Sequence, residues 1–361
     1  MHSGVVVGVG GGRRRLMPRS VVPKDLVHRT RHWSRRRLRG ASDTVSSKEF
    51  RRIGEVARME AQLSVGEAGE IAHALVSSLA RDLGVRALSI KGPVADHYQL
   101  RSPRVAADAD ILVEPSRFSE LCESLQQRGW HKRVGRATPV LLPQHSVTYI
   151  HSDWPCDIDV HWMFPGFFRS VDSAFDALWI GRSSLQLAGQ EVAIPSRAGA
   201  AVVAGLHARR SSRSNRHQRE QDGVDEIVLR EFTTAQQREF LRIAEAGGAL
   251  WTLRDLVLRL DYVGSLSDAT AHEQRMWDLN RTYLEDGSAV GWWVQIRAVP
   301  WCERASLLAR ALWVPRKDIP RNSSDAVPRW RDALAYQINR WRRGTRAIIR
   351  YARGPKGEYR R

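Results

Sequence analysis

The stretch that decides the fold is Asp108-Ala109-Asp110-Ile111-Leu112-Val113. Two acids one residue apart lead directly into aliphatic residues, a pattern typical of a β-strand that starts at a polar edge and runs into a core. Because residues i and i+2 of a strand point to the same face, Asp108 and Asp110 are expected to project together. Neighbouring carboxylates repel each other, and a divalent cation is the usual means of keeping both ionised. The stretch therefore predicts a metal-binding edge of a sheet.

A second acidic segment, Asp157-Ile158-Asp159-Val160-His161, lies farther along the chain. On a strand, Asp157, Asp159 and His161 share one face by the same rule. A third carboxylate on a neighbouring strand would complete a site for one or two Mg²⁺ ions, which is the usual equipment of phosphoryl and nucleotidyl transfer. The spacing alone leaves open whether Asp157 or Asp159 supplies that carboxylate.

The composition sets bounds on the class of protein. The chain has 361 residues, 42% hydrophobic residues and 13 Trp, which is enough for two domains with their own cores. No apolar run approaches the length of a membrane-spanning helix, so no membrane span is expected. The three cysteines, Cys122, Cys156 and Cys302, follow neither a disulfide nor a zinc pattern, which favours reduced thiols and a cytoplasmic location.

The net charge of +18 is concentrated at the two ends of the chain. Residues 1–47 carry eleven Lys and Arg against two acids, and residues 340–361 carry nine against one. The intervening body is therefore close to neutral. Basic tails can contact RNA, DNA or anionic lipid without specificity, and they are also common as solvated, disordered ends. The net charge consequently says little about what the folded core binds.

The apolar periodicity places a small sheet early in the chain and helices late. Strands are expected at residues 85–90, 108–114, 145–151 and 157–163, with a hairpin at 184–194 and helical sequence beyond 196. The predicted fold class is α+β, a small mixed-sheet domain followed by a helical C-terminal domain. The expected boundaries are a basic, disordered extension at 1–46, an α/β domain with leading helices at 47–195, a helical domain at 196–340 and a basic tail at 341–361. Several late tryptophans fall in amphipathic helical sequence and are expected in the core: Trp251, Trp277, Trp292, Trp293 and Trp313.

Four short motifs follow one another in a fixed order: Ile90-Lys91-Gly92, Arg104, Asp108-Ala109-Asp110 and Asp159-Val160-His161-Trp162. An acid pair alone is weak support for any family, whereas this ordered series is far more specific. The series resembles the uncharacterised nucleotidyltransferase family of bacteria, within the polymerase-β-like nucleotidyltransferase superfamily. The resemblance covers residues 70–265 and, more loosely, residues 304–315.

The resemblance implies a role for each motif in a nucleotide site. Gly92 would let the backbone approach a triphosphate closely, and Lys91 would neutralise a phosphate. Asp108 and Asp110 would bind Mg²⁺, with Mn²⁺ as the alternative ion. Asp159 would be the third carboxylate because it matches the family's acid-x-His pattern, and it would bind a catalytic metal that lowers the pKa of the attacking hydroxyl.

Other polar residues near these motifs have two open interpretations. Arg104 precedes the acid pair and could grip a phosphate through both guanidinium nitrogens, or it could lie on the surface; Arg101 is a close competitor for the same role. His161 shares a face with Asp159 and could orient a metal ligand or contact substrate, or it could be a satisfied core histidine.

The helical region adds a further pair of candidates. His207 and the later Asp222-Gly223-Val224-Asp225 resemble a His and an Asp that the family carries on helices of its second domain, facing the active cleft. Between them, residues 211–221 are polar and basic, and this segment is expected to form a loop at the mouth of the cleft.

Together these motifs imply a Mg²⁺-dependent nucleotidyltransferase. It would transfer a nucleoside monophosphate from an NTP such as ATP to an acceptor hydroxyl and release pyrophosphate. The sequence does not choose between a small molecule, a peptide, a protein and an RNA as the acceptor. The alternative is a catalytically idle protein of the same fold that binds nucleic acid or a protein partner through its basic tails. A decayed site would be expected to have lost one of Asp108, Asp110 and Asp159, and all three are present.

Overall fold

The computed structural model describes residues 63–134, 144–211, 214–266, 269–286, 288–319 and 327–353. The extension expected at 1–46 and the end of the basic tail lie outside these residues. The described part is a mixed α+β structure, as the sequence predicts.

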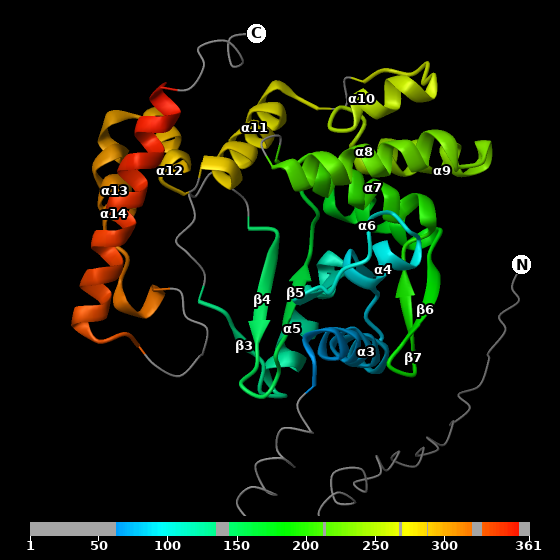
Figure 1. Cartoon of the computed structure of the whole chain (residues 1–361), viewed down its shortest axis with the longest axis horizontal. Helices are drawn as coiled ribbons and strands as arrows, with labels where there is room; N and C mark the ends of the chain where they lie inside the picture. Colours follow the sequence, from blue (N-terminus) through cyan, green and yellow to red (C-terminus); the bar gives the residue numbers. More distant parts are fainter. Residues whose placement is uncertain are drawn as a thin grey trace, which may run out of the picture. The chain divides into compact units, whose positions relative to one another are not determined.

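In the described residues a five-stranded sheet has the order β1-β2-β5-β4-β3 (Figure 1). Strands β2 and β5 run parallel, whereas the other neighbouring pairs are antiparallel, so the sheet is mixed. The four longer strands agree with the apolar runs of the sequence, and the short β3 was not predicted. The strands are β1 (Ala87–Ile90), β2 (Asp108–Val113), β3 (His131–Lys132), β4 (Ser146–Ile150) and β5 (Asp157–His161).

The parallel register of β2 and β5 brings the two acidic segments together. Asp108 pairs with Asp157, and Asp110 pairs with Asp159. Paired residues on neighbouring strands point to the same face, so four carboxylates gather on one face of the sheet, where the interior strands β2 and β5 begin. The next pair on this face, Leu112 and His161, is buried.

The opposite face of the sheet is covered by two helices. Helix α3 (Val65–Leu83) and helix α5 (Phe118–Gln126), which follows the 3₁₀ turn η1 (Pro115–Arg117), pack on the odd-numbered residues of β2. Helix α3 has a defined start because Ser64 and Glu67 form a reciprocal capping box, and it ends at Gly84 with φ 66°. Alternation along β2 thus separates an apolar face from the acidic one.

Helices that follow the sheet in sequence cover its acidic face. One apolar core joins residues of β1 and Leu112 of β2 to residues of the helices α6, α7 and α9. Helix α7 is rich in Ala, Gly and Val and is buried along most of its length, which suits a helix packed on several sides. The elements of this part are α4 (Gly92–His97), α6 (Val171–Ile180), β6 (Ser183–Leu187), β7 (Gln190–Ile194), α7 (Arg197–Ala208), α8 (Asn215–Arg230), α9 (Thr234–Gly247), α10 (Arg254–Val257) and η2 (Leu258–Leu260).

The last part of the chain is helical, as predicted. Small apolar clusters hold it together, one around Trp292 and one around Val314. No helix in the described ranges has both the length and the apolar character needed to cross a membrane. The elements are α11 (Ala271–Asp286), α12 (Ser288–Ala298), α13 (Trp301–Leu312), η3 (Arg316–Asp318) and α14 (Trp330–Arg353).

The expectation that the late tryptophans lie in the core is only half correct. Trp277 and Trp292 are buried and Trp251 is partly buried, whereas Trp293 is 40% exposed and Trp313 is 46% exposed. Consecutive helical residues point about 100° apart, so Trp292 and Trp293 cannot both face the same core. Trp313 follows the end of α13 in an extended conformation, which takes it off the buried face of that helix.

Candidate active site

Four side chains meet on the acidic face of the sheet. The His161 imidazole places Nε2 2.9 Å from Asp110 Oδ1 and 3.1 Å from Asp159 Oδ2. The Lys91 ammonium contacts the same Asp110 oxygen at 2.5 Å. Thr148 on β4 donates a hydrogen bond of 3.0 Å to the other oxygen of Asp159. Asp110 and Asp159 are therefore held in fixed positions by cationic and polar partners.

The charges around Asp110 and Asp159 favour ionised carboxylates. Burial alone would raise both pKa values, but the Lys91 charge and the His161 hydrogen bond outweigh it and hold the pKa of Asp110 well below its usual value. The His161 hydrogen bond lowers the pKa of Asp159 in the same way. Ligand atoms of Asp110, Asp159 and His161 lie within 4.8 Å of one another, a spacing that one divalent cation can span.

Asp108 and Asp157, the outer pair of carboxylates, have different environments. Burial raises the pKa of Asp108, and the nearby Asp110 charge raises it further. Asp108 lines the neighbouring cavity but lies outside the Asp110–Asp159–His161 group. Asp157 is instead occupied by Arg133, whose guanidinium contacts its two oxygens at 2.8 Å and 2.7 Å. Of the two candidates for a third carboxylate, Asp159 is the one beside Asp110.

The turn from β1 into α4 has an unusual backbone. Lys91 has φ 57° and Gly92 has φ 32°, and a positive φ is uncommon for a residue with a side chain. A Cβ on Gly92 would lie 3.5 Å from the Ala106 side chain and 3.8 Å from Nε2 of His73. The turn therefore brings the Lys91 side chain to Asp110, and the positive φ of Gly92, not a lack of space, is what favours glycine there.

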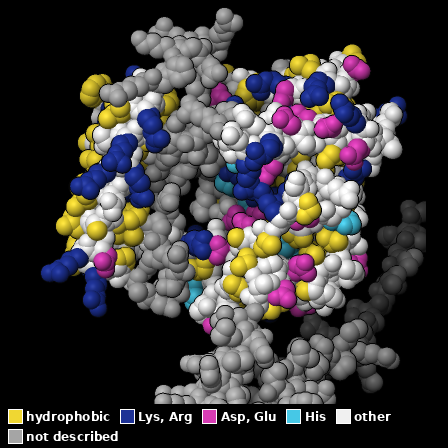
Figure 2. Space-filling view, in the orientation of Figure 1, with side chains coloured by type: hydrophobic (Ala, Val, Ile, Leu, Met, Phe, Trp, Pro, Cys, Tyr) yellow, Lys and Arg dark blue, Asp and Glu magenta, His cyan; other side chains and the backbone are white. Residues whose placement is uncertain are grey.

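A cavity of about 370 Å³ opens beside these residues. Figure 2 shows acidic, basic and histidine side chains gathered around a hollow in the middle of the displayed face. Lys91, Gly92, Asp108 and Asp110 line one side of the cavity, and residues of α7 and α8 line the other. Its volume is within the range of pockets that bind small molecules and cofactors.

Two basic side chains, one on α7 and one in the turn after it, lie near the acids and form no ion pair with any described residue. His207 lines the cavity, and its Nδ1 is buried without a hydrogen-bond partner. Burial and the Lys91 charge hold its pKa well below the usual value. Arg210 is partly buried, and its Nε is buried without a hydrogen-bond partner among the described residues; burial lowers its pKa, while the charges of Asp110 and Asp159 oppose that shift. Unpaired buried donors of this kind suit an anionic ligand.

Arg104 and Arg101 differ from what their sequence positions suggest. Arg104 lines the cavity, and its guanidinium pairs with Glu220 of α8, which also pairs with Arg216 at 3.0 Å. Arg101 is the more buried of the two, and it donates to the Gly92 carbonyl at 3.2 Å and contacts Asp96 at 3.1 Å. Arg101 therefore fixes the turn before the cavity, whereas Arg104 is tied to the opposite wall.

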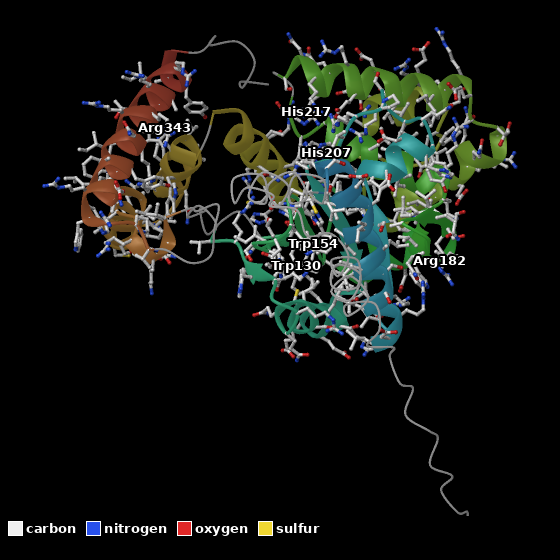
Figure 3. The ribbon with its side chains drawn as sticks, turned by 60° about the horizontal axis from the view of Figure 1, so that its bottom comes forward. Trp130, Trp154, Arg182, His207, His217 and Arg343 are labelled. Atoms are coloured by element: carbon white, nitrogen blue, oxygen red, sulfur yellow. The ribbon has the colours of Figure 1, made fainter. Side chains whose placement is uncertain are left out.

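The polar segment 211–221 is not a loop over its whole length. Residues from Asn215 onward form α8, which begins where the Ser214 hydroxyl accepts a hydrogen bond from the His217 backbone at 3.3 Å. As a result Arg216 and Glu220 occupy helical positions that line the cavity. Figure 3 shows His207 and His217 beside each other, with ring centroids 5.4 Å apart.

Asp225 does not face the cavity as the resemblance implies. It is buried and accepts two hydrogen bonds of 2.9 Å from Arg209, which also contacts Asp255 at 2.9 Å. This buried ion pair joins the end of α7 to α8 and α10. Arg209 and Arg210 are consecutive, yet one holds helices together and the other faces the acids.

Sequence reasoning missed several residues of this region. Arg210 is three residues after His207, so helical spacing could have placed both on one face. His73 and His145 come from distant segments and had no signal: burial lowers their pKa values to about 4 and about 3. His145 stacks on His161 with centroids 5.7 Å apart.

The site thus combines carboxylates with Lys and His side chains on one face of a mixed sheet. Residues 28–257, well over half of the chain, match the family described as uncharacterised nucleotidyltransferase. The chain therefore belongs to that family, as its ordered motifs predict. The match ends at residue 257 and does not extend to the looser resemblance at residues 304–315.

Other comparisons give less detail. One similar solved structure is that of an antigenic nucleotidyltransferase-like protein from Paracoccidioides brasiliensis, which is 15% identical. The similarity covers 56% of this chain and 95% of that chain, with a TM-score of 0.32. No curated protein matches this chain.

Proposed function

We propose that this protein transfers a nucleoside monophosphate from an NTP to an acceptor hydroxyl in a reaction that depends on Mg²⁺. The observation that carries the proposal is the pairing of Asp110 with Asp159 by the β2–β5 register, close to Arg210 Nε and His207 Nδ1, two buried nitrogens with no hydrogen-bond partner among the described residues. Such an arrangement suits a ligand that carries phosphates together with a divalent cation. Membership of the nucleotidyltransferase family supports the same reaction.

The donor set fits a hard divalent cation. Carboxylate oxygens of Asp110 and Asp159 would hold Mg²⁺ or Mn²⁺. Asp108, which lines the cavity, would be a further ligand. A bound ion of this kind neutralises phosphate charge and lowers the pKa of an attacking hydroxyl. Lys91 contacts Asp110 in the structure, and it would turn toward a phosphate when the cation takes its place beside that carboxylate.

The remaining residues would position the substrates. Arg210 and His207 would donate to phosphate oxygens from the α7 side of the cavity, which places the triphosphate between them and the acids. His161 would hold Asp110 and Asp159 in one orientation because it contacts both. Gly92 would leave room for the phosphates at the turn. Arg104 would not contact phosphate directly; its ion pair with Glu220 would hold α8 in place on the other side of the cavity. ATP is one candidate donor, the acceptor stays open, and a cytoplasmic location stays a prediction.

The direct test is transfer of label from each α-labelled NTP to components of a cell extract, with and without Mg²⁺. The wild-type protein is compared with Asp110→Asn/Asp159→Asn and with Asp157→Asn, a matched control in which the carboxylate already bound by Arg133 is neutralised. We expect Mg²⁺-dependent transfer that is lost in the double variant and kept in the control. Transfer that survives the double variant would contradict the proposed metal site.

The alternative function, an idle fold that binds partners through basic tails, predicts a different outcome. Such a protein would show no label transfer and no Mg²⁺-dependent binding of NTP. The presence of Asp110, Asp159 and His161 in one fixed group favours the catalytic function, because an idle site is under no constraint to keep that group together.

A further inference from the structure

The C-terminal helices leave an apolar stripe exposed. On α14, Ala333, Gln337 and Ala347 are buried, which accounts for one face of the helix. A second stripe, at spacings of four, four and three residues, is open to solvent. Its members are Trp330, Leu334, Ile338 and Trp341, which are 65%, 52%, 37% and 41% exposed.

A groove continues this apolar surface between α12, α13 and α14. It has a volume of about 440 Å³. Trp293 and Leu308 line it and are 40% and 43% exposed, and Leu312 lines it and is 55% exposed. Large, contiguous apolar patches on a soluble domain usually mark a site of interaction.

An arginine lies inside the groove without an acidic partner. Arg340 lines the groove, and its Nη1 contacts the Leu312 carbonyl at 3.3 Å. No ion pair of Arg340 occurs among the residues the structure describes. Burial lowers its pKa, and the opposing influence comes from Tyr336 rather than from a carboxylate. A guanidinium in apolar surroundings calls for an anion, so the groove suits a ligand with an apolar body and an anionic head.

The charge of α14 points to the same kind of ligand. The helix carries seven Arg and one Asp, and Figure 2 shows basic side chains beside hydrophobic ones over the C-terminal helices. Figure 3 labels Arg343, which lines the groove on α14. Arginine on one face and Trp, Leu and Ile on the neighbouring face are typical of helices that lie on anionic membrane surfaces. Exposed Leu and Ile do not stack on bases, which makes a nucleic acid the weaker candidate.

We propose that α12, α13 and α14 form a binding surface for the face of an anionic phospholipid bilayer. The apolar stripe and the groove would enter the headgroup and upper acyl region, and Arg340 and Arg343 would contact lipid phosphates. This surface is separate from the nucleotide cavity, lies outside the matched family residues 28–257, and does not depend on the proposed reaction.

The test is co-sedimentation of the full chain with vesicles of phosphatidylcholine alone or mixed with phosphatidylglycerol. The test variant is Leu308→Gln/Leu312→Gln/Arg343→Gln, three exposed side chains of the groove. The matched control is Ile180→Gln/Arg242→Gln, which removes exposed apolar and basic side chains on α6 and α9. Circular dichroism checks that both variants keep the wild-type melting curve.

We expect the wild type to prefer the mixed vesicles. The groove variant should lose about tenfold or more in affinity for them, and the control should stay within about twofold. Equal binding to both vesicle types would overturn the proposal because it shows no dependence on lipid charge. Equal losses in both variants would also overturn it, and wild-type affinity of the groove variant for the mixed vesicles would overturn it and assign the binding to the basic tails. Two further measurements on the groove variant can contradict the proposal: binding of a single-stranded RNA and self-association in sedimentation. If the variant loses either of these and still binds vesicles as the wild type does, the surface serves a nucleic acid or a second copy of the chain, and the proposal is overturned.

Discussion

The cavity beside the sheet and the groove between the C-terminal helices are similar in size but differ in their balance of charge. The cavity, about 370 Å³, is lined by Asp108 and Asp110 together with Lys91 and His207, and the charges of Asp110 and Asp159 act on the nearby Arg210. The groove, about 440 Å³, surrounds Arg340 with apolar side chains. Opposed charges suit a ligand that carries its own cation and phosphates, whereas cations among apolar groups suit an amphipathic anion. The two surfaces thus differ in what surrounds their arginines: carboxylate charges act on Arg210, whereas Tyr336 is the group that acts on Arg340.

The largest expected effect is the loss of label transfer on neutralising Asp110, and it tests whether the cavity and the groove function independently. Asp110→Asn should lower label transfer from NTP about a thousandfold or more, because it removes a charge that the metal site requires. The same variant should bind anionic vesicles as the wild type does. Both quantities are measured on one preparation, and a parallel loss of vesicle binding would show that the two surfaces are coupled.

A substitution of Arg209, which precedes Arg210 and forms a buried ion pair with Asp225, tests whether that arginine serves stability and not nucleotide binding. Arg209→Met would leave Asp225 buried without its partner, so the free energy of unfolding should fall by about 3 kcal/mol or more. Denaturant unfolding measures this change. At temperatures where the variant is folded, its affinity for NTP should match that of the wild type. A stable variant with weakened nucleotide binding would reverse the roles assigned to Arg209 and Arg210.

Arg210 and Arg340 form a matched pair of arginines without an ion-pair partner in the described ranges. Arg210→Gln should weaken binding of Mg²⁺–NTP by about ten- to a hundredfold, the usual value of a charge-assisted hydrogen bond to phosphate. Arg340→Gln should leave this affinity unchanged and lower vesicle binding instead. Fluorescent nucleotide titration and co-sedimentation give the two readouts, and identical behaviour of the two variants would contradict the separation.

The smallest effect concerns the stability of the sheet region at acid pH. Burial lowers the pKa of His73 to about 4 from the unfolded value of 6.5, so the unfolded chain binds a proton first as the pH falls. The stability due to neutral His73 is complete above pH 6.5 and is lost as the pH falls toward 4, at about 1.4 kcal/mol per pH unit. His73→Asn should flatten that slope in denaturant unfolding. An unchanged slope would show that His73 is not the group that titrates.

Local patterns predicted much of the fold and part of the site. The aliphatic run after Asp110 and the alternation around Asp159 gave both central strands, because strand burial and period are properties of short segments. The Lys91-Gly92 motif was found through the family resemblance, whereas the positive φ of Lys91 was not predicted. The family resemblance supplied the order of these motifs, and the match over residues 28–257 confirms the family.

Contacts between distant segments could not be predicted in this way. The different environments of Asp157 and Asp159 depend on Arg133, which lies beyond β3 and far from both in sequence. The contrast between Arg209 and Arg210 depends on the position of Asp225 relative to the end of α7. The exposure of Trp293 depends on which face of α12 meets its neighbours, and composition does not reveal that.

The central claim is that Asp110 and Asp159 bind a metal-bound nucleotide. Isothermal titration calorimetry of each NTP with and without Mg²⁺, on the wild type, Asp159→Asn and Asp157→Asn, tests it most directly. We predict binding that requires Mg²⁺, weakens about thirtyfold or more in Asp159→Asn and changes less than about threefold in Asp157→Asn. Binding that is equally tight without Mg²⁺, or that weakens more in Asp157→Asn, would contradict the account.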